Sequence, residues 1–133
     1  MIKKIYLFSA FIITLVFIAS PAYCTEWLYF IESGEGDKHY IDLDSIKRSP
    51  EGIVSVKRKI MSRDSLKLDY SISEFEMDCE NVKIRKISEK AYEQDRLTAS
   101  TMSKSEWQAV NPEGIDESLY ELACSLKKKR NQK

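Results

Sequence analysis

The apolar run from Ile5 to Ala19 decides how much of this chain is available to fold. It is fifteen residues long and follows a pair of lysines. A secretory signal has an apolar core of about 7 to 15 residues after a basic start, whereas a membrane-spanning helix needs about 20. The run therefore predicts a cleaved signal peptide over residues 1–24, followed by a single domain over residues 25–133. An uncleaved anchor is the alternative, because Pro21 could also end a membrane helix.

Cys24 lies where the signal would be cut. Attachment of lipid to a cysteine needs a small residue before it, because the peptidase must accommodate that side chain, and here the residue is the bulky Tyr23. Signal peptidase prefers small residues at the last and third-last positions. Ala22 and Cys24 meet this preference for a cut before Thr25, and Ser20 and Ala22 meet it for a cut before Tyr23. In the first case Cys24 leaves with the signal, so we expect a periplasmic or secreted protein that is not lipid-anchored.

Two cysteines, Cys79 and Cys124, would then remain. Export places them in an oxidising compartment, where an even number of cysteines most simply forms disulfides. The sequence therefore predicts a Cys79–Cys124 disulfide rather than a nucleophilic cysteine, which would need a base that is missing here. Closing a loop of this length stabilises a domain by roughly 4 kcal/mol in the chain-entropy model.

The charge balance excludes one class of partner. The full chain has 21 basic and 21 acidic residues, and loss of Lys3 and Lys4 with the signal leaves 19 against 21, a net charge of −2. A domain with this balance has no general electrostatic attraction for nucleic acid. We expect no nucleic-acid partner and at most peripheral contact with a membrane.

Most of the remaining chain alternates polar and apolar residues with a period of two, which is typical of half-buried strands. We expect strands over residues 26–32, 38–46, 53–61, 66–79 and 82–92, and a weaker one within 97–107. In the fourth of these, Leu66, Leu68, Tyr70 and Ile72 share one phase, and Phe75, Met77 and Cys79 share the other. This reversal predicts a β-bulge near Ser73 and Glu74 that restores the core face.

The last segment has helical spacing instead. Its apolar residues recur at Ile115, Leu119, Leu122 and Leu126, with acids near the start and bases near the end. Strands first and one helix last predict an α+β fold, an antiparallel sheet of about six strands covered on one face by a C-terminal helix. The predicted disulfide would fasten this helix to the sheet.

Short motifs in this order resemble the surface-adhesin protein E family of small exported bacterial domains. They are Trp27 in the first strand, YIDLDSI at 40–46, FEMDCENVKIRKI at 75–87, WQAVNPEG at 107–114 and LYELAC ending at Cys124. The resemblance implies a sheet of about six antiparallel strands with the helix packed on it. The family is named for an adhesin that binds host extracellular proteins, so it also implies a binding role.

No motif identifies a reaction, a metal site or a cofactor. His39 is the single histidine, and without partners for metal binding or catalysis we expect it at a sheet surface. Asp42 and Asp44 would point the same way in a strand and could bind a cation, but we favour a turn shaped by Asp44 and Ser45. The basic residues Lys127, Lys128, Lys129 and Arg130 could contact a polyanion or an acidic membrane surface, or form a solvated helix end.

Aromatic residues are expected mainly in the core and in cross-strand pairs, and any on the open face of the sheet would make it adhesive. They are Trp27, Tyr29, Phe30, Tyr40, Tyr70 and Phe75. We therefore expect a non-enzymatic exported domain that binds another protein, extracellular or in the cell envelope. The alternative is a periplasmic carrier of a small apolar or haem-like ligand, which a pocket lined by His39 or Tyr40 would favour. A hydrolase is the least favoured class.

Overall fold

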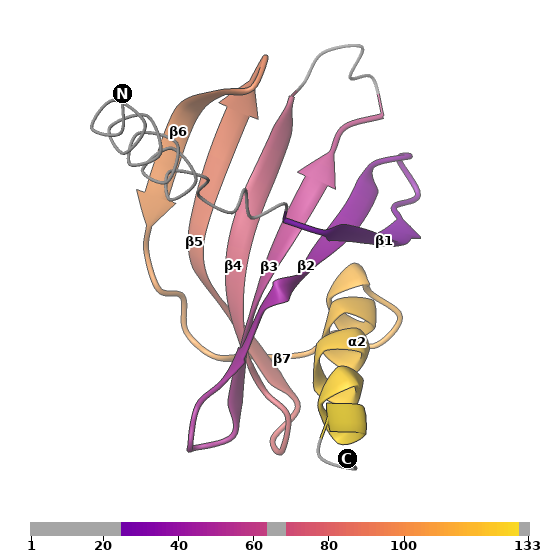
Figure 1. Cartoon of the computed structure of the whole chain (residues 1–133), viewed down its shortest axis with the longest axis vertical. Helices are drawn as coiled ribbons and strands as arrows, with labels where there is room; N and C mark the ends of the chain where they lie inside the picture. Colours follow the sequence, from indigo (N-terminus) through magenta and orange to yellow (C-terminus); the bar gives the residue numbers. More distant parts are fainter. Residues whose placement is uncertain (1–24, 64–68, 131–133) are drawn as a thin grey trace, which may run out of the picture.

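Strands β1 to β6 form one antiparallel sheet in chain order, and helix α2 lies against it (Figure 1). The computed structural model describes residues 25–63 and 69–130, so the predicted signal peptide, Leu66 and Leu68 lie outside the described residues. The strands are β1 (Trp27–Glu32), β2 (Lys38–Arg48), β3 (Ile53–Met61), β4 (Tyr70–Asp78), β5 (Lys83–Glu93) and β6 (Arg96–Met102). The short β7 (Gln108–Ala109) pairs with β5, and α2 spans Ile115–Arg130. The predicted α+β fold is confirmed.

Tight turns join neighbouring strands. Gly36 has a φ of 91° in the turn after β1, a conformation that favours glycine. Between β5 and β6, Gln94 and Asp95 both have positive φ, 49° and 65°. Two such residues between paired strands match the twist of an antiparallel hairpin. The connection between the fifth and sixth strands is therefore a two-residue hairpin turn.

The core lies between α2 and the sheet face that it covers. Val56 on β3 and Met77 on β4 are fully buried, as are Leu119 and Ala123 on α2. These side chains form one hydrophobic cluster with Ile41, Val54, Phe75 and Ile84. Leu119 was expected here from its spacing, whereas Ala123 was not among the predicted contacts. Its small side chain lets the helix approach the sheet closely.

The predicted bulge in β4 is wrong. Residues of β4 pair with β3 in one continuous register, and Ser73 is buried on the same face as Phe75 and Met77. The irregularity lies in β5 instead, where Ile87 has no partner between Glu74 and Phe75. Because β4 keeps its register, Tyr70 and Ile72 point away from the core, to the other face of the sheet.

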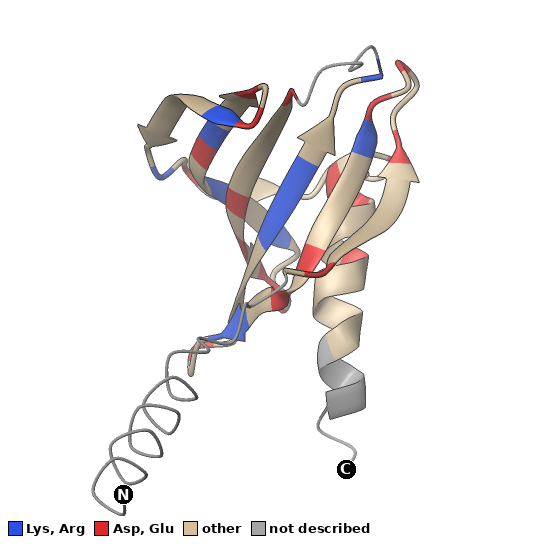
Figure 2. Ribbon diagram, turned by 45° about the horizontal axis from the view of Figure 1, so that its top comes forward, with Lys and Arg blue, Asp and Glu red and all other residues tan. Residues whose placement is uncertain are grey.

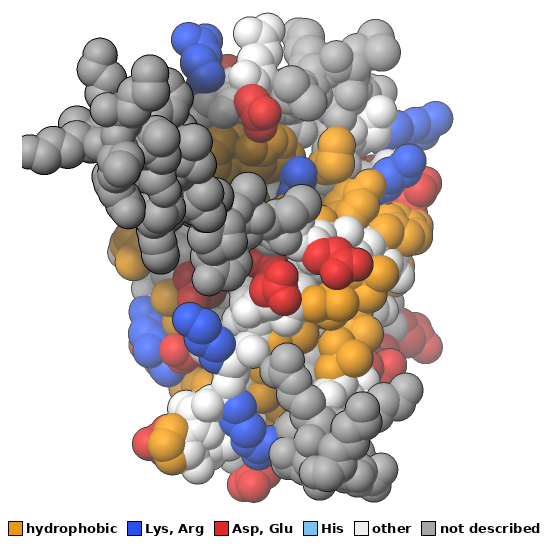
Figure 3. All heavy atoms as spheres, viewed as in Figure 1, with side chains coloured by type: hydrophobic (Ala, Val, Ile, Leu, Met, Phe, Trp, Pro, Cys, Tyr) orange, Lys and Arg blue, Asp and Glu red, His pale blue; other side chains and the backbone are white. Residues whose placement is uncertain are grey.

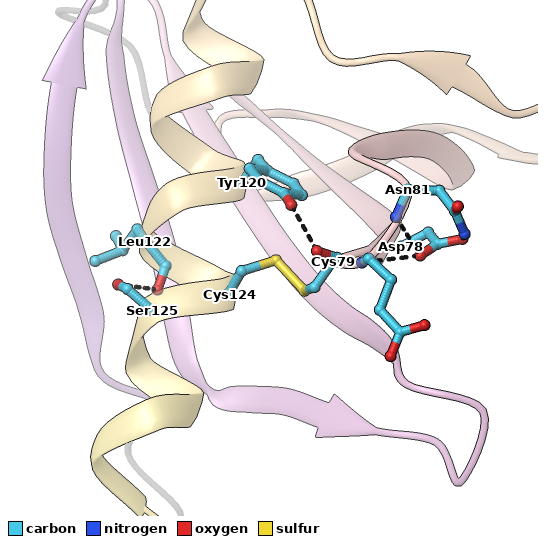
Figure 4. The surroundings of a disulfide bond; sticks show 8 residues. Asp78, Cys79, Asn81, Tyr120, Leu122, Cys124 and Ser125 are labelled. Atoms are coloured by element: carbon cyan, nitrogen blue, oxygen red, sulfur yellow. Dashed lines mark hydrogen bonds between the residues drawn. A yellow bond between two sulfur atoms is a disulfide. The ribbon is translucent and has the colours of Figure 1, made fainter.

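Three contacts fasten α2 to the sheet. The disulfide joins Cys79, just after β4, to Cys124, with a Cα–Cα distance of 5.9 Å (Figure 4). One helical turn earlier, the Tyr120 hydroxyl donates a hydrogen bond of 3.0 Å to the Cys79 carbonyl. At the start of the helix, the Arg58 guanidinium donates to the Asp116 carboxylate at 2.9 Å. The predicted disulfide and its attachment of helix to sheet are confirmed.

No helix among the described residues combines the length and apolar character needed to cross a membrane.

Candidate binding surface

The face of the sheet opposite α2 carries a row of aromatic and lysine side chains. Residues directly opposite each other in neighbouring strands point to the same face. One such row crosses five strands, from β1 to β5, through Tyr29, Tyr40, Lys59, Ile72 and Lys90. The row beside it contains Met61, Tyr70 and Tyr92. We call these residues, together with Trp27 at the start of β1, the open-face surface.

Aromatic rings of the open-face surface contact one another across strands. Tyr29 and Tyr40 meet edge to face with their ring centroids 5.8 Å apart. Tyr29 is 48% exposed. Tyr70 and Tyr92 stack with centroids 4.7 Å apart and an interplanar angle of 15°. Such pairs are worth about 0.5–1.5 kcal/mol beyond their burial, so they hold the rings in a defined arrangement.

Lys59 is held at the centre of this surface by two rings. Its Nζ lies 4.4 Å from the ring centroid of Tyr70 and 5.7 Å from that of Trp27. Both distances are within the range of a cation–π interaction. The ammonium is positioned without using a carboxylate, since Lys59 makes no ion pair with any residue in the described ranges. Its N–H donors remain available to a ligand.

Tyr70 is fixed at its polar end as well. Its hydroxyl donates a hydrogen bond of 2.7 Å to the carboxylate of Asp95 in the β5–β6 turn. This hydrogen bond is the main reason that the pKa of Tyr70 is raised to about 12. Tyr70 therefore stays a neutral hydrogen-bond donor at physiological pH, and its ring rather than its hydroxyl is free for contacts.

Another cation–π pair, formed by Arg85 and Trp107, lies near the other end of this face. The Arg85 guanidinium lies 4.2 Å from the ring centroid of Trp107 and donates to the Glu76 carboxylate, with an Nε–Oε2 distance of 2.7 Å. Lys104 approaches the same carboxylate at 3.3 Å. These groups satisfy one another and attach the segment before β7 to the sheet, so we interpret them as structural.

The six aromatic residues expected in the core and in cross-strand pairs divide between the two faces. Phe75 is buried in the core and Phe30 packs against it, as expected. Trp27, Tyr29, Tyr40 and Tyr70 lie on the open face, at the positions that alternate with the core residues of their strands. Lys59 and Tyr92 were not predicted as surface residues. The phase of Lys59 relative to Val56 contains that signal, whereas Tyr92 is in phase with Ile84 in the sequence and reaches the open face only because of the irregularity at Ile87.

His39 is buried, so the predicted position at a sheet surface is wrong. The residue is 5% exposed, and its ring lies edge to face against Phe30 at 6.2 Å. Its Nδ1 has no hydrogen-bond partner among the described residues. Burial, and secondarily the charge of Arg58, lowers the pKa of His39, while Asp37 and Asp116 act in the opposite direction. The histidine is buried in its neutral form and is not available on the open face.

The depressed pKa predicts a loss of stability in mild acid. The unfolded chain gains a proton on His39 as the pH falls below the ordinary value of 6.5, whereas the folded chain resists it, so the unfolding free energy decreases. We expect the melting temperature of the wild type to fall by several degrees more than that of His39→Gln between neutral pH and about pH 5.5. Thermal unfolding monitored by circular dichroism measures this. Equal decreases of the melting temperature in the two proteins would assign the pH dependence to another group.

Asp42 and Asp44 do not act together. Asp42 is 7% exposed, and its Oδ1 accepts hydrogen bonds from the backbone N–H groups of Asp44 and Ser45, at 3.0 and 3.2 Å. The Ser45 hydroxyl donates to the Asp42 carbonyl at 2.7 Å, while Asp44 is exposed. Local hydrogen bonding was expected from Asp44 and Ser45 at the end of the strand, but the accepting carboxylate is that of Asp42. The bonds form an irregularity within β2, which continues to Arg48.

The remaining site predictions concern a metal site, the basic end of α2 and a ligand pocket. Among the described residues, no group of three or more His, Cys, Asp or Glu could hold a metal ion. Residues Lys127 to Arg130 continue the backbone of α2, but their side chains lie outside the described part. A cavity of about 740 Å³ borders the disulfide and is lined by Phe30, Cys79, Ser118, Tyr120, Glu121, Leu122, Cys124 and Ser125. Neither His39 nor Tyr40 lines it, so it does not support the carrier alternative.

Comparison with known proteins identifies a matching family model and a similar solved structure. The family model described as surface-adhesin protein E matches residues 27–125. A solved structure of protein E from Haemophilus influenzae, in crystal form II, is similar with a TM-score of 0.55 and 13% sequence identity. The similarity covers 80% of this chain and 94% of that chain. No curated protein sequence matches significantly. At this identity, the structural similarity establishes a shared fold.

Proposed function

Because this chain belongs to the surface-adhesin protein E family, we propose that it is an exported, non-enzymatic domain that binds another protein through its open-face surface. The family model covers nearly all of the described chain, so the proposal concerns the whole domain and not an attached module. The resemblance to the family rests on sequence, whereas the choice of surface rests on the placement of side chains.

The observation that carries the proposal is a set of ordered aromatic rings, exposed at Tyr29 and partly exposed at the others, on a sheet face that no helix of the described residues covers. Tyrosine and tryptophan are enriched in protein interfaces because they bury a large area with little loss of side-chain freedom. Here Tyr29, Tyr40, Tyr70 and Tyr92 are arranged by cross-strand contacts. Figure 3 shows hydrophobic side chains over β1 and the adjacent part of α2, but those over α2 belong to the helix side of the sheet and are not part of the open-face surface. A flat surface of this kind suits contact with a protein more than enclosure of a small ligand.

Export is proposed on the basis of residues 1–24. We propose that the mature protein starts at Thr25 and carries no lipid, because Tyr23 disfavours lipid attachment at Cys24. Intact-mass measurement of the protein purified from its own host checks this. An N-terminus at Cys24 with the added mass of a diacylglyceryl group would show a lipid-anchored protein instead.

The binding surface is tested by capture of extracellular and envelope proteins on the immobilised mature domain. We expect the double change Tyr29→Ala and Tyr40→Ala to weaken capture by at least about tenfold, because truncation of central aromatic residues commonly costs more than 1 kcal/mol each. Leu28→Ala with Val82→Ala is the matched control, since these residues are 43% and 48% exposed but lie off the open-face surface. Equal capture by both variants and the wild type would contradict the proposal.

A further inference from the structure

Two lysines of the open-face surface have no acidic residue directly opposite them, unlike most other cations on the same face. Lys38, Lys57, Lys83 and Arg85 each lie directly opposite an acidic residue in a neighbouring strand. Lys59 instead lies between Tyr40 and Ile72, and Lys90 lies between Ile72 and Ser100. Neither forms an ion pair within the described ranges. Lys59 and Lys90 therefore lie among apolar and small residues without an opposing acid, and the other lysine of this face that lacks one, Lys47, lies opposite Ser55 at the far end of the sheet.

The arrangement of charges is visible along the strands. In Figure 2, β3 carries an unbroken basic band, formed by Lys57, Arg58 and Lys59, next to acidic positions on β4. Arg58 points to the core face and pairs with Asp116, and Lys57 faces Asp42 and Glu74. Lys59 is thus the residue of this band that has neither an ion pair among the described residues nor an acidic residue directly opposite it.

The spacing of Lys59 and Lys90 suits a chain with several carboxylates. The two residues are separated by one strand, so their Cα atoms lie about 10 Å apart at a strand spacing of about 4.8 Å. Alternate residues of an extended peptide are about 7 Å apart, and the flexible stem of lysine covers the difference. Ile72 lies between the two lysines in the same row, and Tyr70 and Tyr92 lie in the row beside it.

We propose that the open-face surface binds an extended, acidic segment of a partner protein, in which carboxylate side chains alternate with aromatic or aliphatic ones. This inference rests on the proposed function and adds the chemistry of the partner. Lys59 and Lys90 bind the carboxylates, and Tyr40, Tyr92 and Ile72 contact the apolar side chains. A sulfated polysaccharide fits less well, because it offers charge without apolar groups and would have only two uncompensated lysines at this place.

The test uses a short synthetic peptide that intersperses Glu with Tyr and Leu, and the same peptide with Gln at every Glu position. We expect the mature domain to bind the Glu peptide, to lose affinity with rising salt, and to bind the Gln peptide at least about tenfold more weakly. The double change Lys59→Glu and Lys90→Glu should weaken binding of the Glu peptide by a similar factor. Lys47→Glu with Lys83→Glu is the control, because it changes the net charge equally at the other end of the sheet.

Each outcome decides the inference. Weaker binding of the Glu peptide by the Lys59/Lys90 variant alone supports it. Equal binding of the Gln peptide, equal weakening by the control pair, or stronger binding of heparin in a parallel titration overturns it. If the tyrosine variant loses capture of natural proteins while the Lys59/Lys90 variant retains it, only the acidic-segment inference fails. If neither variant affects capture, the proposed function fails as well.

Discussion

Replacement of Cys124 by serine should lower the melting temperature by on the order of 15 °C. The Cys79–Cys124 bond closes a loop with a sequence separation of 45, and its loss returns roughly 4 kcal/mol of chain entropy to the unfolded state. A domain of this size changes its midpoint by about 4 to 8 °C per kcal/mol, and retained structure in the unfolded chain reduces the full effect. Differential scanning calorimetry measures the shift.

The same variant should loosen the helix before the sheet. Without the disulfide, α2 is still held by the apolar contacts of Leu119 and Ala123. The Tyr120 hydrogen bond and the Arg58–Asp116 pair add to them, but both are polar contacts near partly exposed groups. Amide hydrogen exchange should therefore rise in α2 first. Ser125→Ala is the control, because this exposed residue is adjacent in sequence but points away from Cys79 (Figure 4). A variant as stable as the control would show that the helix docks without covalent help.

Leu119→Ala should destabilise the domain by about 2 to 5 kcal/mol, the usual cost of removing a leucine from a packed core. Leu119 is 0% exposed and lies in the cluster that joins α2 to β2, β3 and β4. The loss adds a cavity to the missing hydrophobic contact, because the disulfide prevents the helix from moving to refill the space. Urea unfolding of the purified mature domain gives the free-energy difference.

Leu122→Ala is the matched comparison for this prediction. The two leucines are equivalent in the helical spacing of the sequence, but Leu122 is only half-buried and lies on the side of α2 away from the disulfide (Figure 4). Its truncation should lower the free energy of unfolding by less than half as much as that of Leu119, because it removes less buried apolar area and because water can fill the space. Equal costs would place both leucines at the centre of the helix contact, contrary to their burial.

The order of elements was predictable because it depends on local patterns. The alternation around Val54 and Val56, the glycine turn after β1 and the helical spacing from Ile115 each specify their own segment. The disulfide followed from counting cysteines in an exported chain, since two remaining thiols have one way to pair. These inferences need no knowledge of which strands are neighbours.

The open-face surface could be predicted only in part. Tyr70 and Ile72 looked like core residues because they are apolar and alternate, and this required a bulge in β4 to bring Phe75 to the same side. The strand instead keeps one register, with the small Ser73 buried on the core face and Tyr70 on the other. Alternation in a strand shows which residues share a face, but it does not show which face a helix covers.

The sequence by itself determined the strands, the C-terminal helix, the disulfide and the family, because each depends on spacing along the chain or on residue identity. Only the tertiary structure decided that His39 is buried, that Ala123 is a core contact, and that Lys59 lies between the rings of Trp27 and Tyr70. These facts depend on which residues from distant segments meet after α2 covers one face of the sheet. Burial and neutralisation of charge are properties of that packing, so they were not available from any segment alone.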